Sequence, residues 1–317
     1  MSIRPAPVRS RGELPVPQLL HRSASRTSRT TPCDNRAVPR LLESAALQLR
    51  VAKRLAPRRG ASLGERLGRR DDRLVFVVGS PRSGTTFLAG VVGSLPGFVD
   101  LGEVAPVKAA VPELARLDPD AAARRLRRIL AVARRVGLVG AVRPVEQTPE
   151  LAHVVDVLPL AFPDAQVIHI VRDGRDVVSS LLEKPWLRPA QSRTDDAGVA
   201  YGAYARFWVE PERRHEFETT SEARRAAWAW RRYVTAARGA QAPVLELRYE
   251  DLSADPAAVA AALASFLGAP EHALATALGS AHSTSVGRYR SDLDAQQLAD
   301  VLDEAGELLR ELGYLGD

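Results

Sequence analysis

The chain has 317 residues, of which 45% are hydrophobic, and its formal net charge is +6 at neutral pH. Its length and apolar content allow a substantial core, built as one large domain or two small ones. Its one cysteine, Cys33, excludes an internal disulfide and a cysteine-based metal site and favours a reducing, intracellular setting. No apolar run reaches about 18 residues, so no membrane span is predicted.

The positive charge is concentrated at the N-terminus. Residues 1–70 contain 16 Lys and Arg against 4 Asp and Glu, whereas the remaining residues contain 28 against 34. Residues 1–36 are rich in Arg, Ser, Pro and Thr and lack the apolar segment of a secretory signal, which predicts a disordered basic tail. Residues 37–70 are predicted to form a helical segment that packs on the body or lies on a membrane. Attraction to an anionic membrane face or a polyanion is the alternative to a solvated tail.

The body, residues 71–317, alternates short apolar runs with amphipathic stretches. The apolar runs at 74–78, 166–171 and 244–248 predict buried strands. Helical spacing is found at 85–95, 119–138, 149–162, 176–182, 221–238, 256–267, 270–279 and 294–312. Such alternation predicts an α/β fold with a central parallel sheet and flanking helices. A polar turn follows each of the three strands, where ligands bind in sheets of this kind.

The turn after the first strand, G-S-P-R-S-G-T-T at 79–86, is similar to a phosphate-binding loop that lacks its lysine. The two glycines have the Walker A spacing, but Thr85 stands where that motif has Lys. Arg82 supplies a cation from within the loop instead. Backbone N–H groups from Ser83 to Thr86 would open the next helix and form an anion site. The alternative is an ordinary glycine-containing turn with a solvated arginine.

The turn after the second strand disfavours a metal-bridged triphosphate. In nucleotide triphosphatases a Lys and Mg²⁺ manage the phosphate charge. Here I-V-R-D at 170–173 places Arg172 before the nearest acidic residue, Asp173, and an arginine at that point suits a second anion better than a cation. The two turns together predict a nucleotide with two separate anionic ends and no metal between them.

Three segments make the chain resemble the sulfotransferases that use 3′-phosphoadenosine-5′-phosphosulfate (PAPS). They are P-R-S-G-T-T at 81–86, V-R-D-G-R-D-V-V-S-S at 171–180 and L-R-Y-E-D-L at 247–252. Each follows a predicted strand, and they occur in the family's order. The resemblance implies a P-loop-NTPase-like three-layer fold over 71–317.

The resemblance also implies which residues bind the co-substrate. The 5′-phosphosulfate loop comprises Arg82, Ser83, Gly84, Thr85 and Thr86. Arg172 and Ser180 would hold the 3′-phosphate, and Tyr249 would lie near the adenine. By contrast, Asp173 is interpreted as a helix cap and Arg175 as solvated or paired.

A later segment, S-V-G-R-Y-R-S-D-L at 285–293, resembles the family's C-terminal loop over the nucleotide. Gly287 and Arg288 would then bind the 3′-phosphate. The alternative is a basic loop that precedes the last helix.

Sulfuryl transfer requires a base for the acceptor proton. Glu103, in D-L-G-E at 100–103, resembles the catalytic glutamate of the tyrosylprotein branch and of related bacterial members. The alternative is a surface acid beside a glycine turn. His153 and His169 are weaker candidates, since one lies on a predicted helix and the other inside a predicted strand.

One position departs from the family pattern. In V-E-Q-T-P at 145–149, Gln147 occupies the place of a lysine that lies near the transferred group in other members. Glutamine donates a hydrogen bond but carries no charge. Either Arg82 alone supplies the positive charge, or the rate is modest, or the chain is a weakened member. Glu146 and Thr148 are candidates for the acceptor side, and the aromatic residues of 184–220 suit either an acceptor site or a local core.

The predicted function is O-sulfotransfer from PAPS to a hydroxyl of a carbohydrate, glycolipid or small metabolite. Arg82 and Glu103 are the predicted catalytic residues. No metal and no nucleic-acid partner are expected, and the predicted location is cytoplasmic or peripheral to an anionic membrane. Two alternatives stay open: a nucleotide kinase or NTPase with a degenerate loop, and a non-catalytic nucleotide-binding protein.

Overall fold

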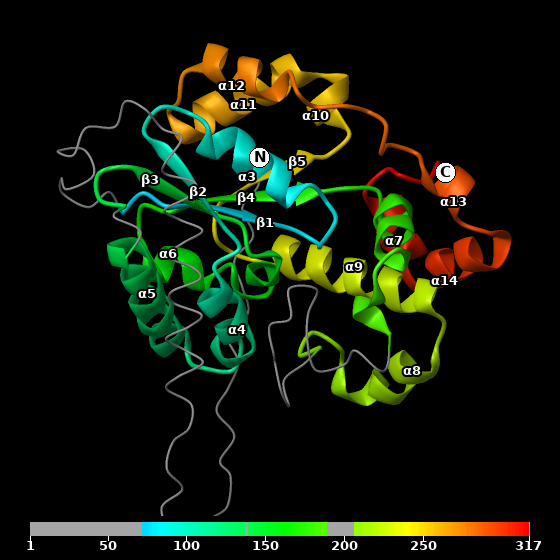
Figure 1. Cartoon of the computed structure of the whole chain (residues 1–317). Helices are drawn as coiled ribbons and strands as arrows, with labels where there is room; N and C mark the ends of the chain where they lie inside the picture. Colours follow the sequence, from blue (N-terminus) through cyan, green and yellow to red (C-terminus); the bar gives the residue numbers. More distant parts are fainter. Residues whose placement is uncertain (1–71, 137–138, 189–205, 317) are drawn as a thin grey trace, which may run out of the picture. The chain divides into compact units, whose positions relative to one another are not determined.

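A five-stranded parallel sheet forms the centre of the fold (Figure 1). The computed structural model describes residues 72–136, 139–188 and 206–316, which all belong to the compact unit Val38–Asp317. The predicted tail 1–36 and the predicted helical segment 37–70 lie outside the described residues. The strands pair in the order β2-β3-β1-β4-β5, all in parallel. They are β1 (Val75–Val78), β2 (Phe98–Gly102), β3 (Arg143–Glu146), β4 (Gln166–Val171) and β5 (Val244–Arg248).

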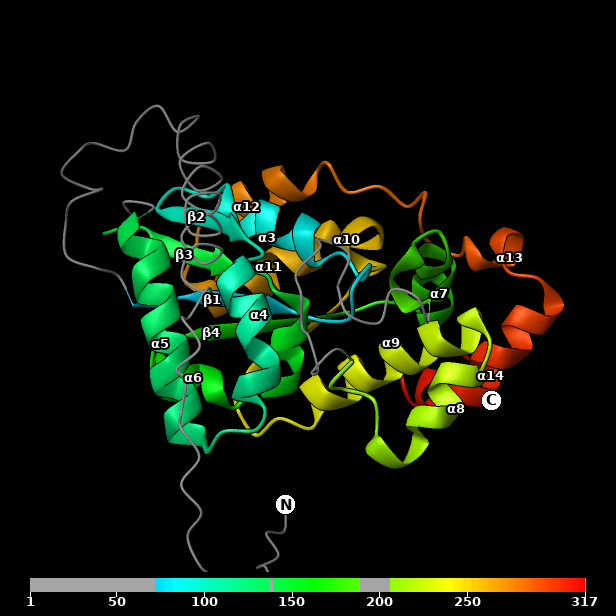
Figure 2. The same cartoon turned by 60° about the horizontal axis from the view of Figure 1, so that its bottom comes forward.

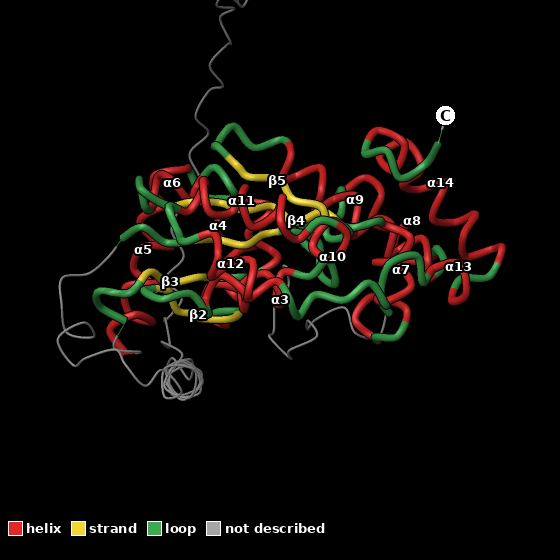
Figure 3. Tube along the Cα trace, turned by 90° about the horizontal axis from the view of Figure 1, so that it is seen from above, coloured by secondary structure: helices red, strands yellow, loops and turns green. Residues whose placement is uncertain are grey.

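Helices cover both faces of the sheet (Figures 1 and 3). One face carries α3 (Thr85–Gly93), α10 (Asp251–Ala254), α11 (Pro256–Leu267) and α12 (Glu271–Leu278). The opposite face carries α4 (Ala105–Leu114), α5 (Pro119–Val136), the 3₁₀ turn Pro149–Val154, α6 (Val157–Ala161) and α9 (Glu222–Arg238). This three-layer arrangement confirms the predicted α/β, P-loop-like fold class.

A further group of helices packs beyond the end of β4. It consists of α7 (Gly174–Leu182), α13 (Tyr289–Asp292) and α14 (Ala295–Glu311), with α8 (Arg214–Thr219) and the 3₁₀ turns Pro185–Leu187 and Pro211–Arg213 nearby. Helix α9 contacts both α7 and α14 (Figure 2), and its Trp230 is fully buried among them. This group of helices therefore lies beyond the carboxyl end of the sheet.

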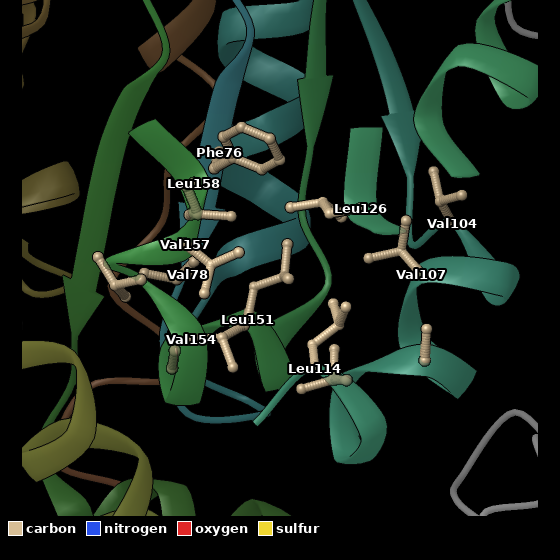
Figure 4. Packing of buried hydrophobic residues seen from close by; sticks show 14 of the residues in the cluster. Phe76, Val78, Val104, Val107, Leu114, Leu126, Leu151, Val154, Val157 and Leu158 are labelled. Atoms are coloured by element: carbon tan, nitrogen blue, oxygen red, sulfur yellow. The ribbon is translucent and has the colours of Figure 1, made fainter. Parts of the chain in front are cut away.

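The core is divided by the central strand β1. Val75 and Val77 pack with α3, α11 and α12, whereas Phe76 and Val78 pack on the other face with residues of α4–α6 (Figure 4). Because β1 is buried on both faces, it reads as an unbroken apolar run rather than an alternating one. The same reasoning explains why the runs of β1 and β4 are easy to identify in the sequence.

All three predicted strands are present, but two more were not predicted. β2 (F-V-D-L-G) and β3 (R-P-V-E) contain Asp, Gly and Pro, which are depleted in strands. The predicted helix at 149–162 is wrong as one element, since a 3₁₀ turn and the short α6 replace it. Helix α4 was also missed. None of the helices within the described ranges is long and apolar enough to cross a membrane.

The end of β2 is shaped by a bulge. The register with β3 shifts between Asp100 and Gly102, and the Asp100 carboxylate accepts a hydrogen bond from the Gly102 N–H at 2.7 Å. The strand therefore stops at Gly102, and Glu103 is the first residue beyond it. Residues 79, 103, 147, 172 and 249 thus each follow one of the five strands, at the same edge of the sheet.

Candidate active site

The loop between β1 and α3 is curled so closely against its neighbours that two positions require glycine. A Cβ on Gly79 would lie 2.5 Å from the carbonyl oxygen of Ile170 in β4. A Cβ on Gly84 would lie 2.5 Å from the ring of Tyr249, and Gly84 also has a φ of 94°. The loop therefore lies directly against the end of β4 and the first residue after β5.

The N-terminus of α3 is open to an anion. No side chain caps this helix, and its first turn contains no acidic residue. Its unpaired N–H groups and the helix dipole favour a negative charge at this point. Ser83 is fully buried, and its hydroxyl has no hydrogen-bond partner among the described residues. The predicted phosphosulfate residues 83–86 thus lie together at the helix start.

Arg82 connects this loop to the second predicted motif. Its Nε donates to the Ser180 hydroxyl at 2.8 Å, although 98 positions separate the two residues in sequence. Its carbonyl oxygen accepts from Nη1 of Arg172 at 3.0 Å. Arg82 has a φ of 72°, which is unfavourable for a residue other than glycine, and these two contacts hold it there.

Arg172 is the buried centre of the site, with 5% of its surface exposed. Its guanidinium lies 4.5 Å from the centre of the Tyr249 ring, a cation–π contact, and its Nη2 donates to the carbonyl of Ser285. The indole N–H of Trp230 donates to its carbonyl at 3.0 Å. Arg172 therefore brings together β4, β5, α9 and the C-terminal loop.

Two unsatisfied donors fit a ligand with two anionic groups. The Ser83 hydroxyl and Nε of Arg172 are buried without a hydrogen-bond partner. Buried polar atoms are normally paired, so each is a donor for a bound group. One lies in the predicted 5′-phosphosulfate loop and the other in the predicted 3′-phosphate motif. The residues present thus fit both ends of PAPS.

Two neighbouring predictions are confirmed. Asp173 caps α7 by accepting from the Arg175 N–H at 3.0 Å. The Arg175 guanidinium pairs with the same carboxylate at 2.7 Å and donates to the Tyr314 carbonyl at 2.8 Å. Arg175 is therefore occupied by protein contacts, as its sequence position suggested.

The C-terminal loop reaches the site, but its predicted ligands are engaged elsewhere. Arg288 pairs with Glu183 and, at 2.6 Å, with Asp292. The Gly287 N–H donates to Asp176 at 2.7 Å. Only Ser285, through its carbonyl, contacts Arg172. The role of Gly287 and Arg288 at the 3′-phosphate stays a prediction.

Glu103 lies at the end of β2 and forms an ion pair that was not predicted. Its Oε2 is 2.7 Å from Nζ of Lys108 in α4, which also lies 3.6 Å from Glu150. The Lys108 side chain is 3% exposed and that of Glu103 is 26% exposed. The sequence contains a signal for a functional role of Lys108, since it is the single charged residue in V-A-P-V-K-A-A-V-P at 104–112.

Glu146 and Thr148 are fully buried and bond to each other instead of lining an open acceptor side. The Glu146 carboxylate also accepts from the Val104 N–H at 3.1 Å, which joins the end of β3 to the residue after Glu103. Burial raises the pKa of Glu146 to about 7. Gln147 is 3% exposed, and its N–H donates to the Gly102 carbonyl at 3.4 Å.

The histidines serve packing. His169 is fully buried within β4, where Nδ1 lies 3.1 Å from Glu246. His153 makes edge contacts with the rings of Phe207 and Tyr233, and burial, with a smaller contribution from Arg232, lowers its pKa to about 3. Tyr201 and Tyr204 of the predicted acceptor region lie outside the described residues.

One family model matches part of the chain. Residues 133–273 match the family described as "Sulfotransferase family", a segment that includes β4, the Arg172–Ser180 motif and Tyr249. Over this segment the chain is similar to sulfotransferases. No curated protein sequence matches the chain.

Several solved sulfotransferases are similar to this chain at low sequence identity. Sulfotransferase STF9 from Mycobacterium avium aligns with a TM-score of 0.50 and 14% identity over 86% of this chain and 84% of its own. The sulfotransferase domain of the Synechococcus PCC 7002 olefin synthase gives 0.44 and 20%, over 76% of this chain and 96% of its own. Mouse SULT7A1, complexed with PAP, gives 0.45 and 16%, over 81% and 94%.

Proposed function

We propose that this protein transfers a sulfuryl group from PAPS to an acceptor hydroxyl and releases 3′-phosphoadenosine 5′-phosphate (PAP). The observation that carries the proposal is the contact of Arg82 with Ser180 and Arg172. This contact joins the phosphosulfate loop to the 3′-phosphate motif in one basic, hydroxyl-rich site. A nucleotide with an anion at each end matches that arrangement.

The chain's own residues would divide the binding of PAPS between them. The N–H groups of residues 83–86, the Ser83 hydroxyl and Arg82 would hold the 5′-phosphosulfate. Arg172 and Ser180 would hold the 3′-phosphate, with the unpaired Nε of Arg172 as a donor. Tyr249 would lie against the adenine, on the ring that already packs over Gly84.

The proposed roles of Gly287 and Arg288 require a rearrangement. Their donors are bonded to Asp176, Glu183 and Asp292. An incoming 3′-phosphate would have to replace these carboxylates as their partner. We therefore assign the two residues to the closure of the 285–292 loop over bound nucleotide, after Arg172 and Ser180 have engaged it.

Glu103 is the proposed base. When bound, PAPS supplies the sulfuryl group and a phosphate leaving group. Glu103 accepts the proton of the acceptor hydroxyl while the new O–S bond forms and the S–O bond to the 5′-phosphate breaks. Arg82 and the loop N–H groups stabilise the negative charge that passes to the departing phosphate oxygen.

The acceptor is proposed to be a carbohydrate, glycolipid or other small metabolite. The proposed acceptor group is a hydroxyl, whose proton the Glu103 carboxylate would take. A peripheral contact of the basic N-terminus with an anionic membrane would suit a lipid-linked acceptor.

A transfer assay tests the proposal. The full-length protein is incubated with ³⁵S-labelled PAPS and, separately, with glycolipids, free carbohydrates and phenolic metabolites. We expect a labelled product with equimolar PAP from at least one class, without added divalent metal, and none from R82A. Mg²⁺-dependent hydrolysis of ATP by the same preparation, with no labelled product, would instead support an NTPase.

A further inference from the structure

Lys108 is a buried cation at the proposed active site. Its side chain is 3% exposed, yet its Nζ lies 2.7 Å from Oε2 of Glu103 and 3.6 Å from Oε1 of Glu150. Removing an ammonium group from water is unfavourable by several kcal/mol unless charged partners surround it. A helix that only had to pack on the sheet would place an apolar residue here, as it does at its other inward positions, Val107 and Val111.

The two carboxylates paired with Lys108 come from different elements, since Glu103 follows β2 and Glu150 lies in the 3₁₀ turn after β3. A third glutamate of this region, Glu146, ends β3 and accepts from the N–H groups of Val104 and Thr148. Glu103 is the most exposed of the three, so it is the carboxyl that an acceptor can reach.

Lys108 also accounts for the uncharged residue at position 147. Gln147 donates its N–H to Gly102, next to Glu103, and its side-chain oxygen is buried without a partner in the described structure. Residue 147, which follows β3, thus supplies no charge at the position where the resemblance led us to expect a lysine. A lysine ammonium is nevertheless present beside Glu103, supplied by Lys108 of α4.

We propose that Lys108 is a positioning residue for sulfuryl transfer, which holds Oε2 of Glu103 and leaves Oε1 for the acceptor proton. The proposal rests on the proposed function of Glu103 as the base. Glu103 is further fixed from the backbone side, because Glu146 holds the N–H of Val104.

Kinetics of three variants test this role. K108M removes the charge, K108R keeps it, and E113Q is the matched control, since Glu113 lies on the same helix with a half-exposed side chain. We expect K108M to lower kcat by about 10- to 100-fold, the range seen when a partner that orients a functional ligand is removed. KM for PAPS should change by less than about twofold, and K108R should recover most of the loss. E113Q should match the wild type.

A double-mutant cycle with Glu103 provides the second test. If Lys108 acts through Glu103, then K108M/E103Q and E103Q should have the same residual kcat. If the two losses multiply, Lys108 acts independently of the base and the proposal is wrong. Should K108M not fold, K108Q, which also lacks the charge, replaces it in the same cycle with E103Q, and a wild-type kcat in folded K108Q likewise contradicts the proposal.

Thermal unfolding distinguishes this proposal from the proposed function itself. If the Lys108–Glu103 pair is formed, the K108M substitution should lower Tm by more in the wild-type background than in E103Q. This holds whether or not the protein transfers a sulfuryl group. A wild-type protein that shows this coupling but neither binds PAP nor transfers a sulfuryl group would refute the function and keep the pair. Coupling absent in a PAP-binding enzyme would refute the pair alone.

Discussion

At the scale of single residues, Arg82 combines an unfavourable backbone conformation with contacts to two distant parts of the site. A φ of 72° is unfavourable for arginine by about 1–3 kcal/mol. Its contacts to Ser180 and Arg172 hold the strained loop in place. Because those contacts come from a different part of the chain, the loop can keep this shape only once β4 and α7 have packed.

Replacement of the proposed base tests its role directly. In E103Q the amide cannot accept the acceptor proton, so we expect kcat to fall by about 10²- to 10⁴-fold. The affinity for PAP, measured by calorimetry, should stay within about twofold, since no nucleotide ligand is removed. Turnover close to that of the wild type would exclude Glu103 as the base.

Glu146 predicts a dependence of stability on pH. Burial raises its pKa from 4.5 to about 7, so the folded protein holds this proton more tightly than the unfolded chain. Its contribution to the free energy of unfolding is complete below about pH 4.5 and is lost as the pH rises to about 7. The whole effect is about 3 kcal/mol at 1.36 kcal/mol for each pKa unit.

The E146Q variant provides the comparison for this prediction. Glutamine does not titrate. The free energies of unfolding of wild type and E146Q, measured in urea at about pH 5 and about pH 8, should therefore change in favour of E146Q as the pH rises. The difference between the two proteins should change by about 2–3 kcal/mol across this range. Parallel pH dependences would show that Glu146 does not titrate in this window.

The sequence predicted which residues the candidate site brings together better than it predicted their surroundings. Arg82, Arg172, Ser180 and Tyr249 lie in short contiguous motifs that follow strands, so local pattern was sufficient to find them. Lys108 was missed because its partner Glu103 follows a strand that the sequence did not reveal. The pairing of Arg288 with Glu183 joins residues far apart in sequence, and no local pattern encodes it.

At the scale of elements, the unit of β1, its loop and α3 depends on close approach to Tyr249. In G84A the new methyl group would lie 2.5 Å from the Tyr249 ring, at a φ of 94°. We expect a loss of about 1–3 kcal/mol in the free energy of unfolding and a PAP affinity at least about tenfold weaker. Chemical unfolding and calorimetry would measure the two effects.

Gly90 offers a matched control within the same helix. It lies in the interior of α3, and a Cβ there would meet nothing within 4 Å. G90A should therefore raise the free energy of unfolding by about 0.5–1 kcal/mol and leave PAP binding unchanged. Equal effects of G84A and G90A on PAP affinity would contradict the close-packing argument.

The elements that escaped prediction are those with the weakest local signals. β2 and β3 contain Asp100, Gly102 and Pro144. The pairing of β3 with β1, and of β2 with β3, overrides their low strand propensity. Because β2 and β3 were not predicted, the sequence placed Glu103 only near a glycine turn and not at the end of a strand. Only the sheet order places it at the same edge as the loop and Arg172.

At the scale of the whole molecule, the basic N-terminal segment 1–70 (the head) and the slightly acidic body 71–317 are expected to have separate roles. Deletion of residues 1–70 removes 16 Lys and Arg and 4 Asp and Glu. If the head attaches the protein to anionic membranes, the shortened protein should lose salt-sensitive co-sedimentation with phosphatidylglycerol vesicles. Its kcat should stay within about twofold of the full chain, because none of the proposed site residues is removed.

Two outcomes would contradict that division of roles. Vesicle binding that survives the deletion would place the membrane contact on the body. Loss of sulfuryl transfer in a shortened protein that still unfolds cooperatively would show that the head takes part in the site. Phosphatidylcholine vesicles serve as the uncharged control for the binding measurement.

Calorimetric titration of PAP into the full-length protein, without metal, tests the central claim most directly, with adenosine 5′-phosphate as the comparison. Arg172 and Ser180 are proposed to bind the 3′-phosphate that only PAP carries, so PAP should bind at least about tenfold more tightly, and the difference should vanish in R172A. Equal affinities for the two nucleotides, or no binding of PAP by the folded protein, would contradict the account.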